Sequence, residues 1–148
     1  MIKKIDHIAV VVEDIERTLA VFRDALGLEL SHTQTIPDQD VKIAFLPVGE
    51  SEIELLEPIS GDSGVARFLA TRGEGLHHIC LEVEDIDAAL ADLKAKGVRL
   101  INETAVAGAH GRVAFLHPKS THGVMIELLE RHSPRTDILT PNSKAQEN

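Results

Sequence analysis

The feature that most constrains this chain is a repeat of its own sequence. The pentapeptide Ile-Glu-Leu-Leu-Glu at positions 53–57 recurs unchanged at positions 126–130. Upstream of each copy, His7 and His78 open matching segments in which His, Ile, Val, Glu, Asp and Ile recur at an offset of 71 residues (78 − 7 = 71). Such self-similarity is the signature of an internal duplication. Two halves related by a pseudo-two-fold axis would bring two histidines and two glutamates to one place.

Composition restricts the class of protein and its partners. At 148 residues, with 43% hydrophobic and 26% charged residues, the chain is predicted to be one soluble globular domain. Its net charge of −9 argues against a nucleic-acid partner, which requires a basic surface. The apolar runs have strand length, so no membrane span is expected. A single cysteine, Cys80, excludes an internal disulfide and indicates a reducing compartment, so we expect a cytoplasmic location.

The hydrophobic pattern predicts an α+β domain over residues 1–131, made of two tandem β-α-β-β-β modules at about 3–58 and 75–130. In each module an aspartate, Asp14 or Asp85, is placed to cap the helix that follows the first strand. A short helix near 62–72 joins the modules. Residues 132–148 are polar and aperiodic, and we expect a mobile tail. The expected strands are 3–12, 28–35, 41–48 and 52–57, then 76–83, 98–103, 112–117 and 123–130.

The repeated residues form a candidate metal site. Strand side chains alternate between faces, so both repeated glutamates face the concave side if their Ile and Leu neighbours face the helices. A buried carboxylate there needs a partner. Two imidazoles and two carboxylates suit Co²⁺, Mn²⁺, Fe²⁺, Ni²⁺ or Zn²⁺ rather than Ca²⁺, and four ligands leave two octahedral positions open for catalysis. The alternative is that each His is a packed strand residue and each Glu points to water. The candidate ligands are His7, Glu54, His78 and Glu127.

The other histidines are interpreted differently. His77 precedes a candidate ligand by one position, so it is expected to face the other way and to be structural. The rest receive structural, loop or supporting roles: His32, His110, His117, His122 and His132. The glycines of the 107–111 loop permit a close backbone approach to another group.

Two such modules, each with an early His and a late Glu, resemble the vicinal oxygen chelate superfamily. Within it, the chain resembles the methylmalonyl-CoA epimerases from about residue 4 to residue 130. The resemblance implies a cupped mixed sheet around a divalent metal, with helices outside and the four candidate ligands above. It also implies that Co²⁺ is the first choice of metal ion, with Mn²⁺, Ni²⁺ or Zn²⁺ as alternatives. The matching segments are 75–79, 108–111, 115–119 and 123–128, with 6–9, 37–39, 53–57 and 62–63 in the first half.

The reaction that the resemblance implies is epimerisation of methylmalonyl-CoA at C2, which interconverts the R and S forms through a metal-stabilised enolate. A proton leaves one face of the carbon and returns to the other, so two acid/base groups are expected. Glu127 is a candidate for one, as ligand and proton shuttle together. Some family members carry a second glutamate where this chain has Ile43. The second group is therefore unassigned, with Lys42, Gln39 and a metal-bound water as candidates.

The same resemblance implies how a CoA thioester would be held. The 108–111 loop and the 117–120 turn would line the entrance, with Lys119 as a phosphate or pantetheine contact or, alternatively, a solvated turn lysine. A homodimer is also implied. Alternatives are a glyoxalase I-type lyase acting on a glutathione thiohemiacetal and an extradiol dioxygenase, which would leave Glu54 unexplained. A metal-free ligand-sequestering protein would carry apolar or aromatic groups at the ligand positions. The expected substrate-binding residues are Gln39, Gly108, His110, Gly111 and Lys119.

Overall fold

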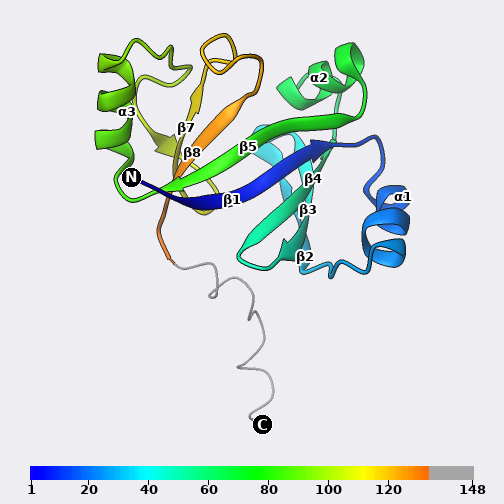
Figure 1. Ribbon diagram of the computed structural model, residues 1–148. Helices are drawn as coiled ribbons and strands as arrows, with labels where there is room; N and C mark the ends of the chain where they lie inside the picture. The colour runs from blue at the N-terminus through cyan, green and yellow to red at the C-terminus, as the bar shows by residue number, and fades with distance from the viewer. Residues whose placement is uncertain (134–148) are drawn as a thin grey trace.

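The computed structural model describes residues 1–133, which build one eight-stranded mixed sheet with helices packed against it (Figure 1). Of the expected tail at 132–148, residues 134–148 lie outside the described residues. The strands are β1 (Ile2–Val11), β2 (His32–Ile36), β3 (Val41–Val48), β4 (Ser51–Pro58), β5 (Gly75–Val83), β6 (Val106–Ala107), β7 (Gly111–Leu116) and β8 (Ile126–Arg131). The helices are α1 (Ile15–Leu19), which continues as the π-helical η1 (Ala20–Ala25), the 3₁₀ turn η2 (Pro37–Gln39), α2 (Gly64–Arg72) and α3 (Ile86–Ala95).

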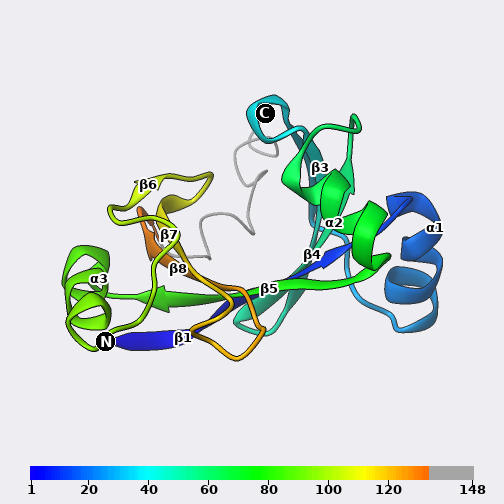
Figure 2. The ribbon, with the colours of Figure 1, turned by 90° about the horizontal axis from the view of Figure 1, so that it is seen from above.

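The order of the strands shows the duplication directly. The sheet runs β2-β3-β4-β1-β5-β8-β7-β6, so the two modules occupy its two halves. β1 pairs in parallel with β4, β5 pairs in parallel with β8, and the two first strands pair antiparallel at the centre. Figure 2 shows β1 and β5 crossing the base while the outer strands rise on either side, which gives the sheet a cupped shape. The predicted α+β class with a cupped mixed sheet is confirmed.

The repeated pentapeptide serves both the concave face and the helices. Its first glutamate faces the cup, whereas its second accepts a hydrogen bond from the start of the module's helix. Glu57 Oε1 lies 3.0 Å from the backbone nitrogen of Ile15, and Glu130 Oε1 lies 3.2 Å from that of Ile86. A carboxylate at a helix N-terminus satisfies a free N–H group and complements the helix dipole. The repeat therefore ties each module's last strand to its helix.

The connecting helix α2 differs from the predicted arrangement, which placed all helices outside the sheet. α1 and α3 do pack on the outer face, and Asp14 and Asp85 cap them as predicted. On α2, Val65, Phe68 and Leu69 instead pack against concave-face residues of β1, β3 and β4. An apolar helix stripe determines that a helix is buried but not which surface covers it. None of the helices described is long and apolar enough to cross a membrane.

Three predicted strands differ from the structure. The second begins only at His32 and the last only at Ile126, while residues 98–103 contain one isolated bridge, between Leu100 and Leu116, in place of a strand. In the second module the side chain of Asn102 accepts the hydrogen bond of Phe115 N at 2.8 Å. Because a side-chain oxygen accepts this hydrogen bond in place of a backbone carbonyl, the β-ladder between residues 98–103 and β7 does not continue past this point. The edge strand β6 forms further along, at Val106–Ala107.

Candidate metal centre

The four sequence-predicted ligands converge at the centre of the cup. His7 (β1) Nε2 lies 2.9 Å from Glu54 (β4) Oε2 and 3.2 Å from both His78 (β5) Nε2 and Glu127 (β8) Oε2. His78 Nε2 lies 2.9 Å from Glu127 Oε2. All four residues are buried, with 5–8% of their surface exposed. The alternative in which the histidines are separate packed residues and the glutamates point to water is therefore wrong.

Protons partly balance the charge of this cluster in the metal-free protein. Burial opposes protonation of His7, but Glu54 and its other acidic neighbours outweigh that effect and raise the pKa of His7 well above 6.5. Burial likewise favours the neutral form of Glu127, but hydrogen bonds from His7 and His78 outweigh it and lower the pKa of Glu127 to about 2. A positive charge is thus favoured between two carboxylates.

A divalent cation fits the same place. Two carboxylates and two neutral imidazoles carry two negative charges, which a divalent ion balances. Donors in neighbouring positions of an octahedral ion with bonds of about 2.1 Å lie about 3.0 Å apart. The four nitrogen and oxygen separations here are 2.9–3.2 Å. The donor types and their spacing therefore fit one of the transition metals named above.

A bulge places Asp6 behind His7, a contact that strand alternation does not predict. The β1–β5 register jumps from Ile5↔Leu81 to His7↔Cys80, so Asp6 is an extra residue on β1. Its Oδ2 accepts from His7 Nδ1 at 2.8 Å, and Arg131 Nε donates to Oδ1 at 2.7 Å. Burial alone would raise the pKa of Asp6, but these hydrogen bonds hold it below its usual range. In the neutral ring that would bind a metal, Asp6 therefore keeps the proton on Nδ1 and leaves the lone pair of Nε2 for the ion.

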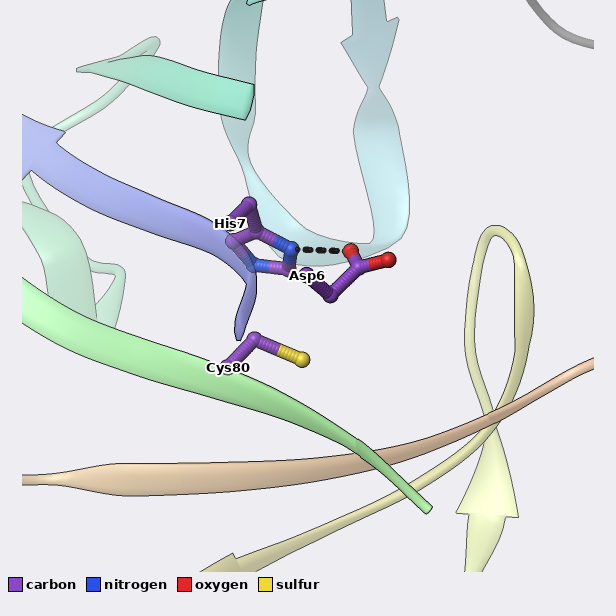
Figure 3. A group of neighbouring side chains, drawn as sticks. All are labelled: Asp6, His7 and Cys80. Carbon is purple, nitrogen blue, oxygen red and sulfur yellow. Dashed lines mark hydrogen bonds and ion pairs between the residues drawn. The ribbon is translucent and has the colours of Figure 1, made fainter. Parts of the chain in front are cut away.

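Figure 3 shows Asp6 and His7 beside Cys80 of the neighbouring strand β5. These residues offer ligand atoms all within 4.8 Å of one another, but they make a poor second metal site. Asp6 is already paired with Arg131. Burial raises the pKa of the Cys80 thiol to about 12, whereas a thiolate is what binds metal.

A second bulge corrects the prediction for His77. The register jumps from Ala9↔His78 to Val10↔Leu76, so His77 is the extra residue on β5 and does not face away. Its Nδ1 lies 2.8 Å from His78 Nδ1, and its ring packs edge-on against Phe68 at 5.0 Å between centroids. Burial is the main cause that lowers the pKa of His77 to about 4.

The cluster lies at the base of a cavity of about 210 Å³. Among the expected substrate-binding residues, Gln39, Gly108 and His110 line it, together with Ile43. Its other walls are largely apolar: Ile36, Val41, Leu56, Val65, Val113, Phe115 and Leu129. Such walls exclude water and strengthen electrostatic interactions inside.

Two other expected substrate-binding residues lie elsewhere. Gly111 is not among the residues that line the cavity; a Cβ at this position would collide with the Glu130 carbonyl on β8. The close approach predicted for the glycine loop is thus made to the protein's own backbone. Lys119 lies in an exposed turn beside His117, and its neighbour Pro118 lines a larger groove of about 840 Å³. The groove and the cavity share Gln39, Val65 and His77, so they adjoin.

Known proteins share this architecture. A family model described as the Glyoxalase/Bleomycin resistance protein/Dioxygenase superfamily matches residues 6–115. Human mitochondrial methylmalonyl-CoA epimerase is 41% identical over 127 residues, which is 84% of this chain and 72% of that protein. The ethylmalonyl-CoA/methylmalonyl-CoA epimerase of Cereibacter sphaeroides is 42% identical over 131 residues, which is 86% of this chain and 98% of that protein.

A solved structure agrees with these relatives. A Streptomyces coelicolor methylmalonyl-CoA epimerase variant, in complex with 2-nitronate-propionyl-CoA, matches with a TM-score of 0.83 and 38% identity, over 90% of this chain and 98% of that one. Fold, sequence identity and length of the match all point the same way. The chain belongs to the methylmalonyl-CoA epimerase family of the Glyoxalase/Bleomycin resistance protein/Dioxygenase superfamily.

Proposed function

We propose that this enzyme is an epimerase that interconverts the R and S forms of methylmalonyl-CoA at C2. The observation that carries the proposal is the His₂Glu₂ cluster at the base of a narrow, largely apolar cavity, in a chain of this family. The relatives favour this reaction over the glyoxalase-type alternative. The dioxygenase alternative needs two His and one Glu, whereas Glu54 and Glu127 both belong to the cluster.

His7, Glu54, His78 and Glu127 are the proposed metal ligands, with Co²⁺ as first choice and Mn²⁺, Ni²⁺ or Zn²⁺ as alternatives. When bound, the ion supplies Lewis-acid stabilisation of the negative charge that develops on the substrate oxygens as C2 loses its proton. The protein's part is to hold the four donors, exclude water and move the proton. Asp6 orients His7 for this task through the 2.8 Å hydrogen bond to Nδ1.

Glu127 is the proposed carrier of one proton, as a carboxylate that lines the cavity; the other three candidate ligands line it as well. The second carrier stays unassigned. Ile43 lines the cavity where some relatives have a glutamate, and Lys42, its neighbour on β3, is not among the lining residues. Gln39 and His110 are, and both remain candidates for contact with the substrate.

The two adjoining spaces suit the two ends of the substrate. The inner cavity of about 210 Å³ has room for the branched malonyl group, and the groove of about 840 Å³ has room for part of the CoA arm. Arg67 and Arg72 of α2 line that groove and offer positive charge to phosphates. Gly108 and His110 would contact the acyl group, whereas Gly111 and Lys119 would act through the loop and turn that carry them. A homodimer and a cytoplasmic location complete the proposal.

The test is hydrogen exchange at C2. Metal-stripped enzyme, reconstituted with Co²⁺, is incubated with methylmalonyl-CoA in D₂O, and the C2 proton is followed by NMR. Metal-dependent loss of that signal at a catalytic rate is expected, followed by interconversion in a stereochemical assay. Glu127→Gln should abolish turnover while the protein stays folded, and near-normal activity would remove Glu127 from the chemistry. Absence of exchange with every divalent metal tried would refute the epimerase proposal and direct the search to glutathione thiohemiacetals.

A further inference from the structure

We propose that His77 is a positioning residue, which accepts a hydrogen bond from His78 Nδ1 and so holds His78 in the tautomer that presents Nε2 to the metal. The inference rests on the proposed metal site. It begins with the two bulges, which are related by the duplication: Asp6 and His77 share the offset of 71 that relates His7 to His78 (77 − 6 = 71). Each bulge brings the residue before a candidate ligand to the Nδ1 of that ligand.

The tautomer follows from the contacts of His78. Its Nε2 points into the cluster, 2.9 Å from Glu127 Oε2 and 3.2 Å from His7 Nε2. A histidine nitrogen binds a cation through its lone pair, so the proton of neutral His78 must lie on Nδ1. The partner of that nitrogen is His77 Nδ1, at 2.8 Å. One of two facing nitrogens must donate and the other accept, so His77 Nδ1 is the acceptor.

The arrangement of charge explains why an imidazole stands where the first module has a carboxylate. Asp6 is neutralised by Arg131, whose Nε lies 2.7 Å from its Oδ1. The offset between the last strands is 73 residues (126 − 53 = 73), which makes Pro58 the counterpart of Arg131. No guanidinium therefore reaches the second bulge from the equivalent position. A carboxylate there would add a buried negative charge near Glu127 without the direct ion pair that Asp6 has, whereas an imidazole accepts the same hydrogen bond without adding charge.

The helix α2 holds His77 in this orientation. Phe68 packs edge-on against the His77 ring, with centroids 5.0 Å apart and planes at 67°. Arg72, one turn further along α2, lies over the Phe68 ring at 5.4 Å. Because His77 lies where the inner cavity and the outer groove adjoin, the helix that lines the groove also orients a residue behind a metal ligand.

The test compares variants of His77 in the full chain. His77→Phe keeps a ring against Phe68 but removes the hydrogen-bond acceptor. His77→Leu also removes the acceptor, with a side chain of different shape. His77→Asn restores an acceptor, because its amide oxygen reaches nearly the same place as Nδ1. The matched control is His132→Phe, which removes an exposed histidine outside the site. Folding of each variant is checked by circular dichroism and thermal denaturation without metal.

Affinity for Co²⁺ and Zn²⁺ is measured by competition with a chelating dye. His77→Phe and His77→Leu should bind about 10–100-fold more weakly than the parent, as changes behind a metal ligand do. His77→Asn and His132→Phe should bind as the parent does. Parent-like affinity in a folded His77→Phe or His77→Leu would overturn the inference while leaving the metal site in place. A parent that binds no divalent metal would overturn the proposed site, and the inference with it.

A second readout does not depend on the variants folding. Long-range ¹H–¹⁵N correlation spectra of the Zn²⁺-loaded parent report which nitrogen of each imidazole carries the proton. The expected pattern is a proton on Nδ1 of His78 and on Nε2 of His77. Zinc bound to Nδ1 of His78, or a proton on Nδ1 of His77, would overturn the assignment.

Discussion

Gly111→Ala tests whether the glycine of the 108–111 loop is required by the fold itself. A Cβ at this position would lie 2.9 Å from Arg131 Cα and 2.9 Å from the carbonyl carbon of Glu130, with the Glu130 oxygen closer still. These are backbone atoms of the neighbouring strand β8, which cannot rotate aside. Carbon atoms pack at about 3.5–4.0 Å, so β7 and β8 must part by roughly 1 Å. The glycine is therefore a condition for the strands to pair.

The cost can be worked out from that displacement. Overpacking costs about 1–3 kcal/mol, and each ladder hydrogen bond lost at the Gly111↔Arg131 pair costs about 1 kcal/mol more. We expect a loss of about 3 kcal/mol in the free energy of unfolding. At about 2–4 °C per kcal/mol for a chain of this size, the melting temperature should fall by about 6–12 °C.

Calorimetry and urea unfolding measure this loss, with Gly61→Ala as the matched control because a Cβ there meets nothing within 4 Å. Gly111 O also accepts from Gly108 N at 2.7 Å, so the loop that carries His110 should shift and activity should fall as well. A Gly111→Ala protein as stable as Gly61→Ala would refute the steric argument. Parent stability with lost activity would instead assign the glycine to substrate contact.

Two further predictions concern charge. Glu130→Ala removes the acceptor of Ile86 N and should cost about 1 kcal/mol in urea unfolding, since α3 keeps its Asp85 cap but loses a second N-terminal partner. The exposed Glu103→Ala should cost close to nothing, and equal losses would contradict the role of Glu130 at the helix start. In metal-stripped protein, the raised pKa of His7 contributes stability that is fully present below pH 6.5 and is lost as pH rises through its folded pKa. The lowered pKa of Glu127 contributes stability that is present above pH 4.5 and is lost as pH falls toward 2. Thermal melts with and without Co²⁺ should show an alkaline loss that metal suppresses, and a flat alkaline profile in the stripped protein would contradict it.

The location of the cluster could be predicted from the sequence because the duplication supplies information that a single module lacks. One strand histidine says little, but the same His and Glu at matched places in two modules predict a meeting point. Strand alternation then placed Glu54 and Glu127 on the concave face, where the structure has them. The packing of Leu56 and Leu129 into the cavity follows the same two-residue period.

The partners behind the histidines could not be predicted, because both depend on bulges. A bulge inserts one residue into a strand and reverses the expected face of its neighbour, and no residue type in 5–7 or 76–78 marks it. Strand alternation therefore puts His77 on the wrong face and gives no sign that Asp6 is a partner of His7. The missing strand at 98–103 has a similar cause, since the side chain of Asn102 replaces a backbone acceptor.

A duplicated site also raises the question of orientation. His7 and Glu54 repeat as His78 and Glu127, so the four donors alone do not distinguish the thioester end of a substrate from its carboxylate end. Orientation must come from parts that the duplication does not repeat. Among the residues described, α2, a segment between the modules, lines part of the outer groove and carries both arginines that line it. In the proposed binding mode the CoA arm lies in this groove, so the repeated donors would acquire distinct roles through the unrepeated helix.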